Sequence, residues 1–245
     1  CSNLCVNSCV YCGFRSDNCA EKRHVLTMEE VRRETEAVID EGHKRLIAVY
    51  GEHPQSDADY IADSMATIYA TQRVTPTGNG FNIRRININA APMSIENLRK
   101  LWRAGIGTYQ VFQETYHPGR YAELHPANTI KGNFRWRLYA MHRAMDAGID
   151  DVAIGALFGL YDWRFEVMGL VHHAHDLERQ FGIGPHTISF PRMQPALGSF
   201  VSENSPYLVR DDAFRRLVTV LRLAVPYTGL IVTARERAEL RREII

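Results

Sequence analysis

The sequence has no cysteine after position 19. All five cysteines of the 245-residue chain come early, as Cys1, Cys5, Cys9, Cys12 and Cys19. A secretory signal is also lacking, because the polar, cysteine-rich start has the wrong chemistry for a signal peptide. Clustered thiols without such a signal indicate metal or catalytic ligands in a reducing compartment rather than disulfides, so we expect a cytoplasmic location.

Other absences narrow the class of protein. No apolar run approaches the ~20 residues of a membrane-spanning helix. Neither sign of charge is in excess, with 29 Lys and Arg against 28 Asp and Glu, so no binding to nucleic acid or to a membrane is expected. With 45% hydrophobic residues the chain can form a large core without disulfides. Because it starts on Cys1, we interpret it as a piece of a longer protein.

Short apolar runs alternate with amphipathic stretches along the whole chain. The expected strands are 45–50, 84–90, 108–115, 151–159, 186–193 and 229–234. The expected helices are 27–42, 58–72, 94–104, 133–147, 165–181 and 211–224. Strands separated by helices predict a parallel sheet, and the pattern is that of an α/β fold, a TIM-type (βα) barrel with about six units visible and both ends truncated. We expect one core domain over 1–245.

Local signals refine this scheme. Thr27 and Glu30 form a capping box at the start of the first helix. The run RLIAVY, at 45–50, is continuously apolar, as expected of a strand buried on both faces. The irregular connections 51–57, 73–83, 116–132 and 194–210 mostly follow strands, which in a parallel barrel places them on the active-site side.

Cys5, Cys9 and Cys12 form a C-x3-C-x2-C motif. Three thiolates on one loop can hold three irons of a [4Fe–4S] cluster and leave the fourth iron open for a small molecule. The alternative is a zinc-stabilised binding module without catalysis, with further ligands drawn from Cys19, His24 and the group His172, His173 and His175. Cys1 and Cys19 lie outside the motif spacing and are expected to be incidental thiols.

The motif, with Tyr11 before its last cysteine, resembles that of the radical S-adenosylmethionine superfamily. Further stretches resemble its aromatic amino acid lyase branch: YGEHP, RRININ, GIGTYQVFQETYH, HP at 125–126, AGIDDVAIGALFGL, GPHTISFPRMQP and AVPYTGLIVTARE. GEHP, GPHTIS and AVPYTG resemble the tyrosine lyases of [FeFe]-hydrogenase maturation more than the 2-iminoacetate synthases of the thiamine pathway. The second iron–sulfur cluster of the former lies in a C-terminal extension, and no second cysteine set occurs here.

The resemblance implies a radical enzyme. In this family S-adenosylmethionine binds the open iron and yields a 5′-deoxyadenosyl radical, which starts cleavage of the Cα–Cβ bond of tyrosine to p-cresol and dehydroglycine. The implied cofactors are a [4Fe–4S] cluster and S-adenosylmethionine. The implied partners are L-tyrosine and an electron donor such as a flavodoxin or ferredoxin.

Candidate site residues follow from the strand ends and from the resemblance. Gly51 and Glu52 resemble the turn that binds the methionine part of the cofactor. The other candidates for binding S-adenosylmethionine are Tyr11, Asn87, Glu114, Gly155 and Leu157. The small Gly155 would let the adenosyl group approach its strand closely.

Candidates for substrate binding or catalysis are Arg85, Gln113, Tyr116, Ser189, Arg192 and Arg235. Gln113 and Tyr116 flank a strand end, which in a barrel faces the active site. Arg192 offers a planar fork that suits a carboxylate, and Ser189 adds a hydroxyl donor three residues away. Arg85 shares the parity of Asn87 on its strand and is expected to point into the barrel.

Overall fold

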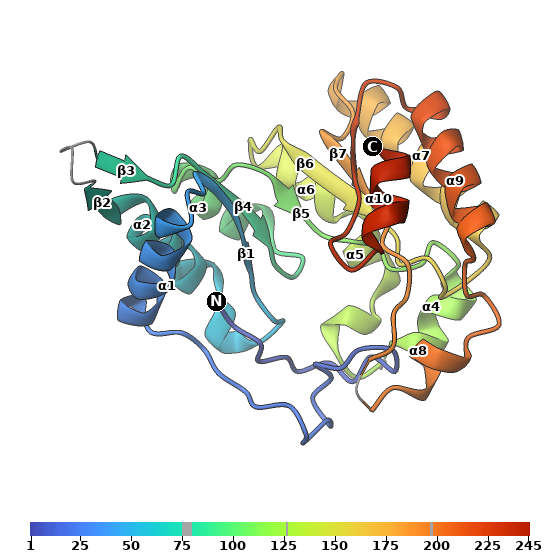
Figure 1. The fold of residues 1–245 in the computed structure, drawn as a ribbon, viewed down its shortest axis with the longest axis horizontal. Coiled ribbons are helices and arrows are strands. Elements are labelled where there is room, and N and C mark those ends of the chain that lie inside the picture. Colours follow the sequence, from blue (N-terminus) through green and yellow to red (C-terminus); the bar gives the residue numbers. More distant parts are fainter. Residues whose placement is uncertain (75–79, 126, 197) are drawn as a thin grey trace.

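The fold is described from a computed structural model, which covers residues 1–74, 80–125, 127–196 and 198–245. Six strands form one sheet, in which all neighbours are parallel. In spatial order they are β1 (Arg45–Val49), β4 (Arg85–Asn89), β5 (Tyr109–Gln110), β6 (Val152–Gly155), β7 (Thr187–Ser189) and β8 (Gly229–Ile231). The sheet curls into an open part-barrel with β1 and β8 at its two edges (Figure 1), which confirms the predicted parallel βα fold.

Helices cover the outer face of the sheet and pack side by side in chain order. They are α1 (Met28–Asp40), α2 (Ala58–Ala70), α3 (Ile95–Arg103), α6 (Ala140–Asp146), α7 (Trp163–Phe181) and α9 (Asp211–Ala224), with α10 (Ala238–Ile244) against α9. Within the described residues, no helix has both the length and the apolar character needed to cross a bilayer.

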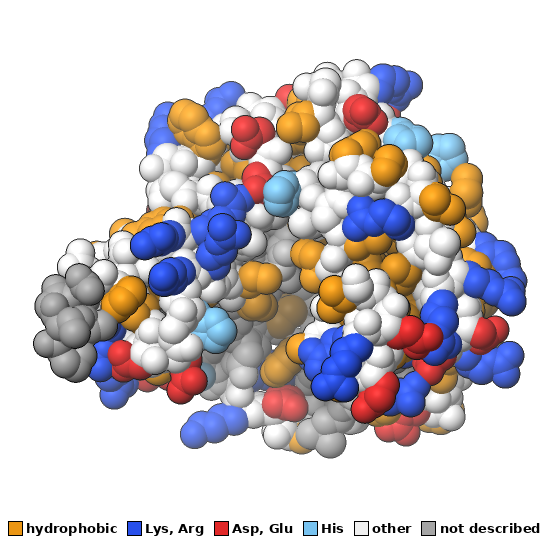
Figure 2. All heavy atoms as spheres, turned by 45° about the horizontal axis from the view of Figure 1, so that its top comes forward, with side chains coloured by type: hydrophobic (Ala, Val, Ile, Leu, Met, Phe, Trp, Pro, Cys, Tyr) orange, Lys and Arg blue, Asp and Glu red, His pale blue; other side chains and the backbone are white. Residues whose placement is uncertain are grey.

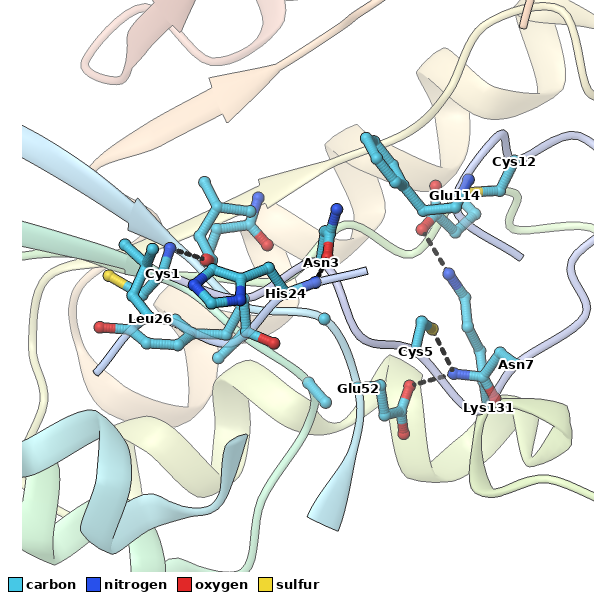
Figure 3. A pocket seen from close by; sticks show the side chains of 18 of the residues that line it. Cys1, Asn3, Cys5, Asn7, Cys12, His24, Leu26, Glu52, Glu114 and Lys131 are labelled. Atoms are coloured by element: carbon cyan, nitrogen blue, oxygen red, sulfur yellow. Dashed lines mark hydrogen bonds and ion pairs between the residues drawn. The ribbon is translucent and has the colours of Figure 1, made fainter. Parts of the chain in front are cut away.

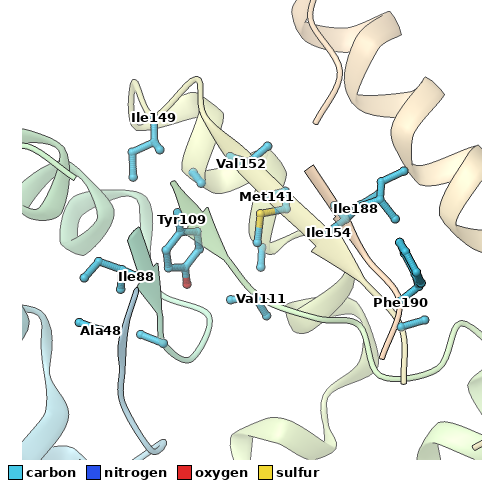
Figure 4. Close-up of a cluster of buried hydrophobic side chains, with 14 of the residues drawn as sticks. Ala48, Ile88, Tyr109, Val111, Met141, Ile149, Val152, Ile154, Ile188 and Phe190 are labelled. Atoms are coloured by element: carbon cyan, nitrogen blue, oxygen red, sulfur yellow. The ribbon is translucent and has the colours of Figure 1, made fainter. Parts of the chain in front are cut away.

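The hydrophobic core lies between the sheet and these helices. Apolar and polar residues alternate along β4, so one face of the strand contributes to the core. Ile86 and Ile88 are fully buried, whereas Asn87 and Asn89 point to the other face and are only half-buried. Side chains from neighbouring strands, among them Tyr109, continue the buried layer (Figure 4). The helix-facing side of the sheet is therefore apolar, and polar side chains are left for the inner face.

The inner face is open at the β1 edge. Ile47 and Val49 pair with Asn87 and Asn89 and are 48% and 52% exposed. The expectation that the run at 45–50 is buried on both faces is therefore wrong, because helices cover only one side of this edge strand. In the space-filling view the molecule is hollowed at its centre, and hydrophobic side chains are visible within the hollow (Figure 2).

Two expected elements are interrupted. The strand expected over 108–115 is hydrogen-bonded as β5 at only two residues, and Glu114 further along has a positive φ of 71°. The helix expected over 133–147 is divided at Tyr139 into α5 (Phe134–Leu138) and α6. Both interruptions bend the chain toward the carboxyl end of the sheet, where it contributes charged side chains described below.

The long connections contain structure that sequence periodicity did not indicate. An antiparallel pair, β2 (Gln72–Val74) and β3 (Gly80–Asn82), flanks undescribed residues 75–79. Three 3₁₀ or α-helical turns, η1 (Pro54–Ser56), α4 (Pro118–Leu124) and η2 (Ile130–Gly132), lie in two other connections, and α8 (Phe200–Asn204) in a third. Residues 1–19, here called the cysteine loop, run past the carboxyl end of the sheet toward α4 and α8 (Figure 1).

The predicted capping box of α1 is confirmed and can be tested. The amide of Glu30 donates to Thr27 Oγ1 at 3.3 Å, and the amide of Thr27 donates to Glu30 Oε2 at 2.7 Å. We expect Thr27→Ala to lower the free energy of unfolding by about 1 kcal/mol, because one orphan amide loses its acceptor. Thr27→Ser keeps the hydroxyl and should stay near wild type. Urea denaturation measures both, and equal stabilities of the two variants would contradict the cap.

Candidate cluster and cofactor site

The cysteine loop docks through its backbone on the turn that follows β1. The amide of Gly51 donates to the carbonyl of Ser2 at 2.9 Å, and the amide of Val6 donates to the carbonyl of Glu52 at 2.8 Å. A Cβ atom on residue 51 would lie 1.9 Å from the carbonyl oxygen of Leu4. Glycine is therefore required at this position because two backbones approach each other there.

The three motif thiols gather at one end of a cavity of about 540 Å³. Cys5 and Cys12 line it, whereas Cys9 is 3% exposed beneath them. Burial raises the pKa of the Cys9 thiol; Lys131 opposes this effect, and the neighbouring Cys5 and Cys12 add to it. All are free thiols. This donor set fits a [4Fe–4S] cluster, with the cavity in front of it.

The zinc hypothesis finds no support in the arrangement of the metal-ligating side chains. Over the described ranges, no three His, Cys, Asp or Glu side chains are placed to hold one metal ion. In a [4Fe–4S] cluster, by contrast, each thiolate binds a different iron. His173, on α7, lines a separate groove on the helical side together with His172 and His175. His24 pairs instead with Glu30 at 3.1 Å.

The rest of the cavity comes from three strand ends and from one long connection. Its lining residues are Cys1, Ser2, Asn3, Cys5, Asn7, Cys12, Phe14, His24, Leu26, Val49, Tyr50, Gly51, Glu52, Asn89, Ala90, Ala91, Glu114, Lys131 and Arg137. Of the residues predicted for cofactor binding, Gly51, Glu52 and Glu114 are brought together here. Figure 3 shows Glu52 beside Cys5, and Glu114 near Cys12.

Asn7 links two of these groups and was missed in the sequence. Its Nδ2 donates to Glu52 Oε2 at 2.8 Å and to Cys5 Sγ at 3.6 Å (Figure 3). The position of Asn7 between Cys5 and Cys9 was the available signal for a role at the site. Asparagine is also common in turns for purely structural reasons, so this signal alone did not indicate a role.

Glu114 forms the centre of a buried ion cluster. Its Oε1 accepts from Lys131 Nζ at 2.9 Å and from Arg137 Nη2 at 3.1 Å. Burial acts to raise the pKa of Glu114, but the two cations outweigh it and lower the pKa to about 2. Two cations thus face one carboxylate, which leaves this wall of the cavity attractive to an anionic group. No pattern in the sequence indicated Lys131 or Arg137.

Tyr11 anchors the loop and does not line the cavity. Its hydroxyl donates to His125 Nε2 at 2.8 Å, because His125 Nδ1 donates to the carbonyl of Tyr121, also at 2.8 Å. Burial lowers the pKa of His125 to about 3, so the ring stays neutral. Ser199 Oγ donates to the Val10 carbonyl at 2.8 Å on the same side. The side chain of Tyr11 therefore tethers the loop, and the predicted contact of this residue with S-adenosylmethionine stays a prediction.

The other inner-face candidates lie near the cavity without lining it. Asn87 Oδ1 accepts a hydrogen bond from the amide of Thr108 at 3.0 Å. Asn89, two residues further along β4, lines the cavity, where Asn87 was expected. A Cβ on Gly155 would lie 2.6 Å from the ring of Phe112, so this glycine accommodates a neighbouring side chain. Leu157 packs against the cluster of buried side chains that contains Cys9.

Two substrate candidates are buried close to this region. Ser189 is 6% exposed on β7 and pairs in register with Gly155. Gln113 is 3% exposed, and both polar atoms of its side chain lack a hydrogen-bond partner among the described residues. Their roles toward a substrate stay predictions.

Arg85 and Tyr116 are placed elsewhere. Arg85, at the amino end of β4, forms an ion pair with Asp151 just before β6, so it lies at the opposite edge of the sheet from the cavity. The hydroxyl of Tyr116 is hydrogen-bonded to His173 Nδ1 at 2.8 Å, on the side of the sheet that α7 covers. Each side chain has a partner that the sequence did not reveal, and the predicted roles of Arg85 and Tyr116 toward a substrate stay predictions.

The side chain of Arg192 is bound by groups of the protein itself. Its Nε donates to Glu236 Oε1 at 2.8 Å, and its Nη1 donates to Asp211 Oδ1 and to the Val209 carbonyl, each at 2.9 Å. Arg235 is exposed and lines a small cavity beside this group. Arg192 joins the ends of β7 and β8 to the start of α9, and the roles of Arg192 and Arg235 toward a substrate stay predictions.

The structural role of Arg192 can be tested with a double-mutant cycle. Its side chain is 10% exposed and that of Glu236 is 1% exposed. We expect Arg192→Met to lower the free energy of unfolding by about 3–5 kcal/mol, because it leaves the buried carboxylate of Glu236 unpaired. Glu236→Met should cost less, because Arg192 keeps its ion pair with Asp211. The double variant should lose less stability than the sum of the two single variants. Losses that simply add in urea denaturation would contradict a direct interaction.

The close approach at Gly51 gives a second test. We expect Gly51→Ala to displace the cysteine loop and to cost about 1–3 kcal/mol, since the new methyl group overlaps the Leu4 carbonyl. The variant should also retain less iron than wild type after anaerobic reconstitution. Gly80→Ala is the matched control, because a Cβ there meets none of the described residues within 4 Å. Wild-type iron content and stability in Gly51→Ala would show that the loop does not depend on this contact.

Comparison with known proteins identifies the family. Residues 1–168 match the radical SAM superfamily, and residues 189–245 match the biotin and thiamin synthesis associated domain. Both segments contribute strands to the same sheet. The chain is 32% identical over its whole length to a 2-iminoacetate synthase of Salmonella typhimurium, of which it covers 61%.

Two solved structures are also similar. HydG, a maturase of the [FeFe]-hydrogenase, is 49% identical with a TM-score of 0.93 over 99% of this chain and 52% of its own. HydG from Carboxydothermus hydrogenoformans is 44% identical with a TM-score of 0.91, over 99% of this chain and 54% of its own. The chain thus spans about half to three-fifths of the length of these relatives. The chain belongs to the radical SAM superfamily, whose members use a [4Fe–4S] cluster and S-adenosylmethionine.

Proposed function

We propose that this chain is the core of a tyrosine lyase that cleaves the Cα–Cβ bond of tyrosine to p-cresol and dehydroglycine, in the maturation of [FeFe]-hydrogenase. The observation that carries the proposal is the cysteine loop fixed over the cavity at the carboxyl ends of β1 and β4, with Glu52 and Glu114 facing the same space. The likeness to HydG over nearly the whole chain supports the choice of reaction.

Each group of the cavity has a part in binding the cofactors. Cys5, Cys9 and Cys12 would hold the cluster. When bound, the cluster supplies the electron that splits S-adenosylmethionine and so provides the radical that removes hydrogen from the substrate. The carboxylate of Glu52, which Asn7 holds at one oxygen, suits the ammonium group of the cofactor.

The ion cluster serves the same site by charge and by exclusion of water. Lys131 and Arg137, whose side chains are 13% and 9% exposed, carry one charge more than Glu114 neutralises, so this wall can accept a carboxylate. They are the Lys and Arg side chains that line the described part of the cavity and can bind the carboxylate of an amino acid. Gln113 and Ser189 remain candidates for contacts deeper on the inner face of the sheet.

A second function with support is that of a 2-iminoacetate synthase in thiamine biosynthesis. The identity to the Salmonella synthase extends over the full chain, and both families act on tyrosine. The two differ in the fate of dehydroglycine, so the site described above serves either. The lysis of tyrosine is common to both proposals and is tested first.

The test uses anaerobically purified protein reconstituted with iron and sulfide. With tyrosine, S-adenosylmethionine and a reductant, p-cresol should form and be detected by chromatography. Cys9→Ala should abolish product because one iron loses its thiolate, whereas Cys19→Ala, at an exposed thiol outside the motif, should match wild type. Product formation by Cys9→Ala would contradict the ligand set. Full cluster content without any p-cresol in wild type would contradict the reaction.

A further inference from the structure

Asn7 occupies an unusual position between a thiol and a carboxylate of the cavity. It is 1% exposed, and its carboxamide nitrogen donates one hydrogen to Glu52 Oε2 at 2.8 Å and the other to Cys5 Sγ at 3.6 Å. Its backbone carbonyl accepts from the amide of Ser16 at 2.8 Å. The residue is thus fixed by its main chain, and its side chain has both N–H groups committed to the site (Figure 3).

The opposite end of this carboxamide has no partner. Asn7 Oδ1 is buried and accepts no hydrogen bond from the described residues. A buried acceptor without a hydrogen bond destabilises the folded state, so such groups call for an explanation. Turning the amide over would place Oδ1 against the carboxylate of Glu52 and the sulfur of Cys5, which are both acceptors. The observed orientation is therefore selected by these two groups together.

A second thiol of the motif also receives a hydrogen bond. The backbone amide of Phe14 donates to Cys12 Sγ at 3.4 Å. Two of the three motif sulfurs therefore face N–H donors, one from the main chain and one from the side chain of Asn7. The donor of Asn7 belongs to a side chain, so a substitution that shortens this side chain removes its hydrogen bond to sulfur and leaves the backbone donor of Phe14 in place.

We propose that Asn7 is a positioning residue that raises the reduction potential of the cluster by donating a hydrogen bond to the Cys5 thiolate while it holds Glu52 in place. Hydrogen bonds to sulfur stabilise the more negative, reduced cluster and are a recognised means of tuning such potentials. The inference rests on the proposed function only in requiring that the cluster is bound at Cys5, Cys9 and Cys12.

The experiment is an anaerobic redox titration of the reconstituted protein, followed by electron paramagnetic resonance. Asn7→Ala removes the donor, and Asn7→Asp replaces it with a carboxylate of the same shape. We expect both variants to keep the wild-type iron content and to show a midpoint potential more negative than wild type, with the larger shift in Asn7→Asp because a negative charge is added. Neither readout depends on turnover of substrate.

Asn18→Ala is the matched control in the same loop. Asn18 donates to the Gly13 carbonyl at 2.7 Å and accepts from the amide of Ala20 at 3.2 Å, so its loss loosens the loop backbone. The midpoint potential of the cluster in Asn18→Ala should equal that of the cluster in wild type. An equal shift in Asn18→Ala would show that loop slackening, not the bond to sulfur, changes the potential, and would overturn the proposal.

Other outcomes are equally decisive. An unchanged potential in fully loaded Asn7→Ala would overturn the proposal and leave the proposed function standing. Failure of both Asn7 variants to load iron, while Asn18→Ala loads normally, would assign Asn7 to assembly of the site and overturn its role in tuning. A wild-type protein that binds no cluster would overturn the proposed function as well.

Discussion

The contact between two backbones at Gly51 is the constraint on which the site depends. Hydrogen bonds from the turn after β1 fix the cysteine loop at the carboxyl end of the sheet, and Cys9 and Tyr11 of the loop pack into a small buried cluster of their own. The position of this turn is set by β1, whose register with β4 places Val49 beside Asn89. Cluster ligands, the carboxylate of Glu52 and the open end of the part-barrel are thereby brought to one cavity by main-chain geometry.

Buried charge forms the second layer of the site. Glu114 adopts a left-handed backbone conformation that costs a non-glycine residue about 1 kcal/mol or more. Its ion pairs with Lys131 and Arg137 offset this cost and fix two segments of a long connection against the strand end. Burial acts to lower the pKa of Lys131 and of Arg137, but Glu114 opposes this effect and the pKa of each is raised, so both cations stay charged and the wall of the cavity keeps its positive character.

Sequence alone predicted those features that depend on local pattern. The spacing of Cys5, Cys9 and Cys12 indicated the cluster, and alternating apolar runs indicated the parallel sheet, because both signals lie within a few residues of each other. The partners of Arg192 and Tyr116 could not be predicted, because Glu236 and His173 lie far away in the chain. Lys131, Arg137 and Asn7 were missed for the same reason: nothing in an irregular segment shows which carboxylate it will meet. The positive φ of Glu114 is likewise not indicated by any periodicity.

The tether of the cysteine loop has a consequence for the order of folding. The hydroxyl of Tyr11 is hydrogen-bonded to His125, 114 residues further along the chain. The Val10 carbonyl accepts a hydrogen bond from Ser199, 189 residues further along the chain. Contacts that close such long segments carry the largest entropy cost and are favoured only once the intervening structure has formed. We therefore expect the sheet and its helices to assemble first and the loop to close onto them last. Until the loop closes, Tyr11 and Val10 do not yet hold the thiols of the motif against the rest of the fold, so we expect iron and sulfide to reach these thiols most readily before closure.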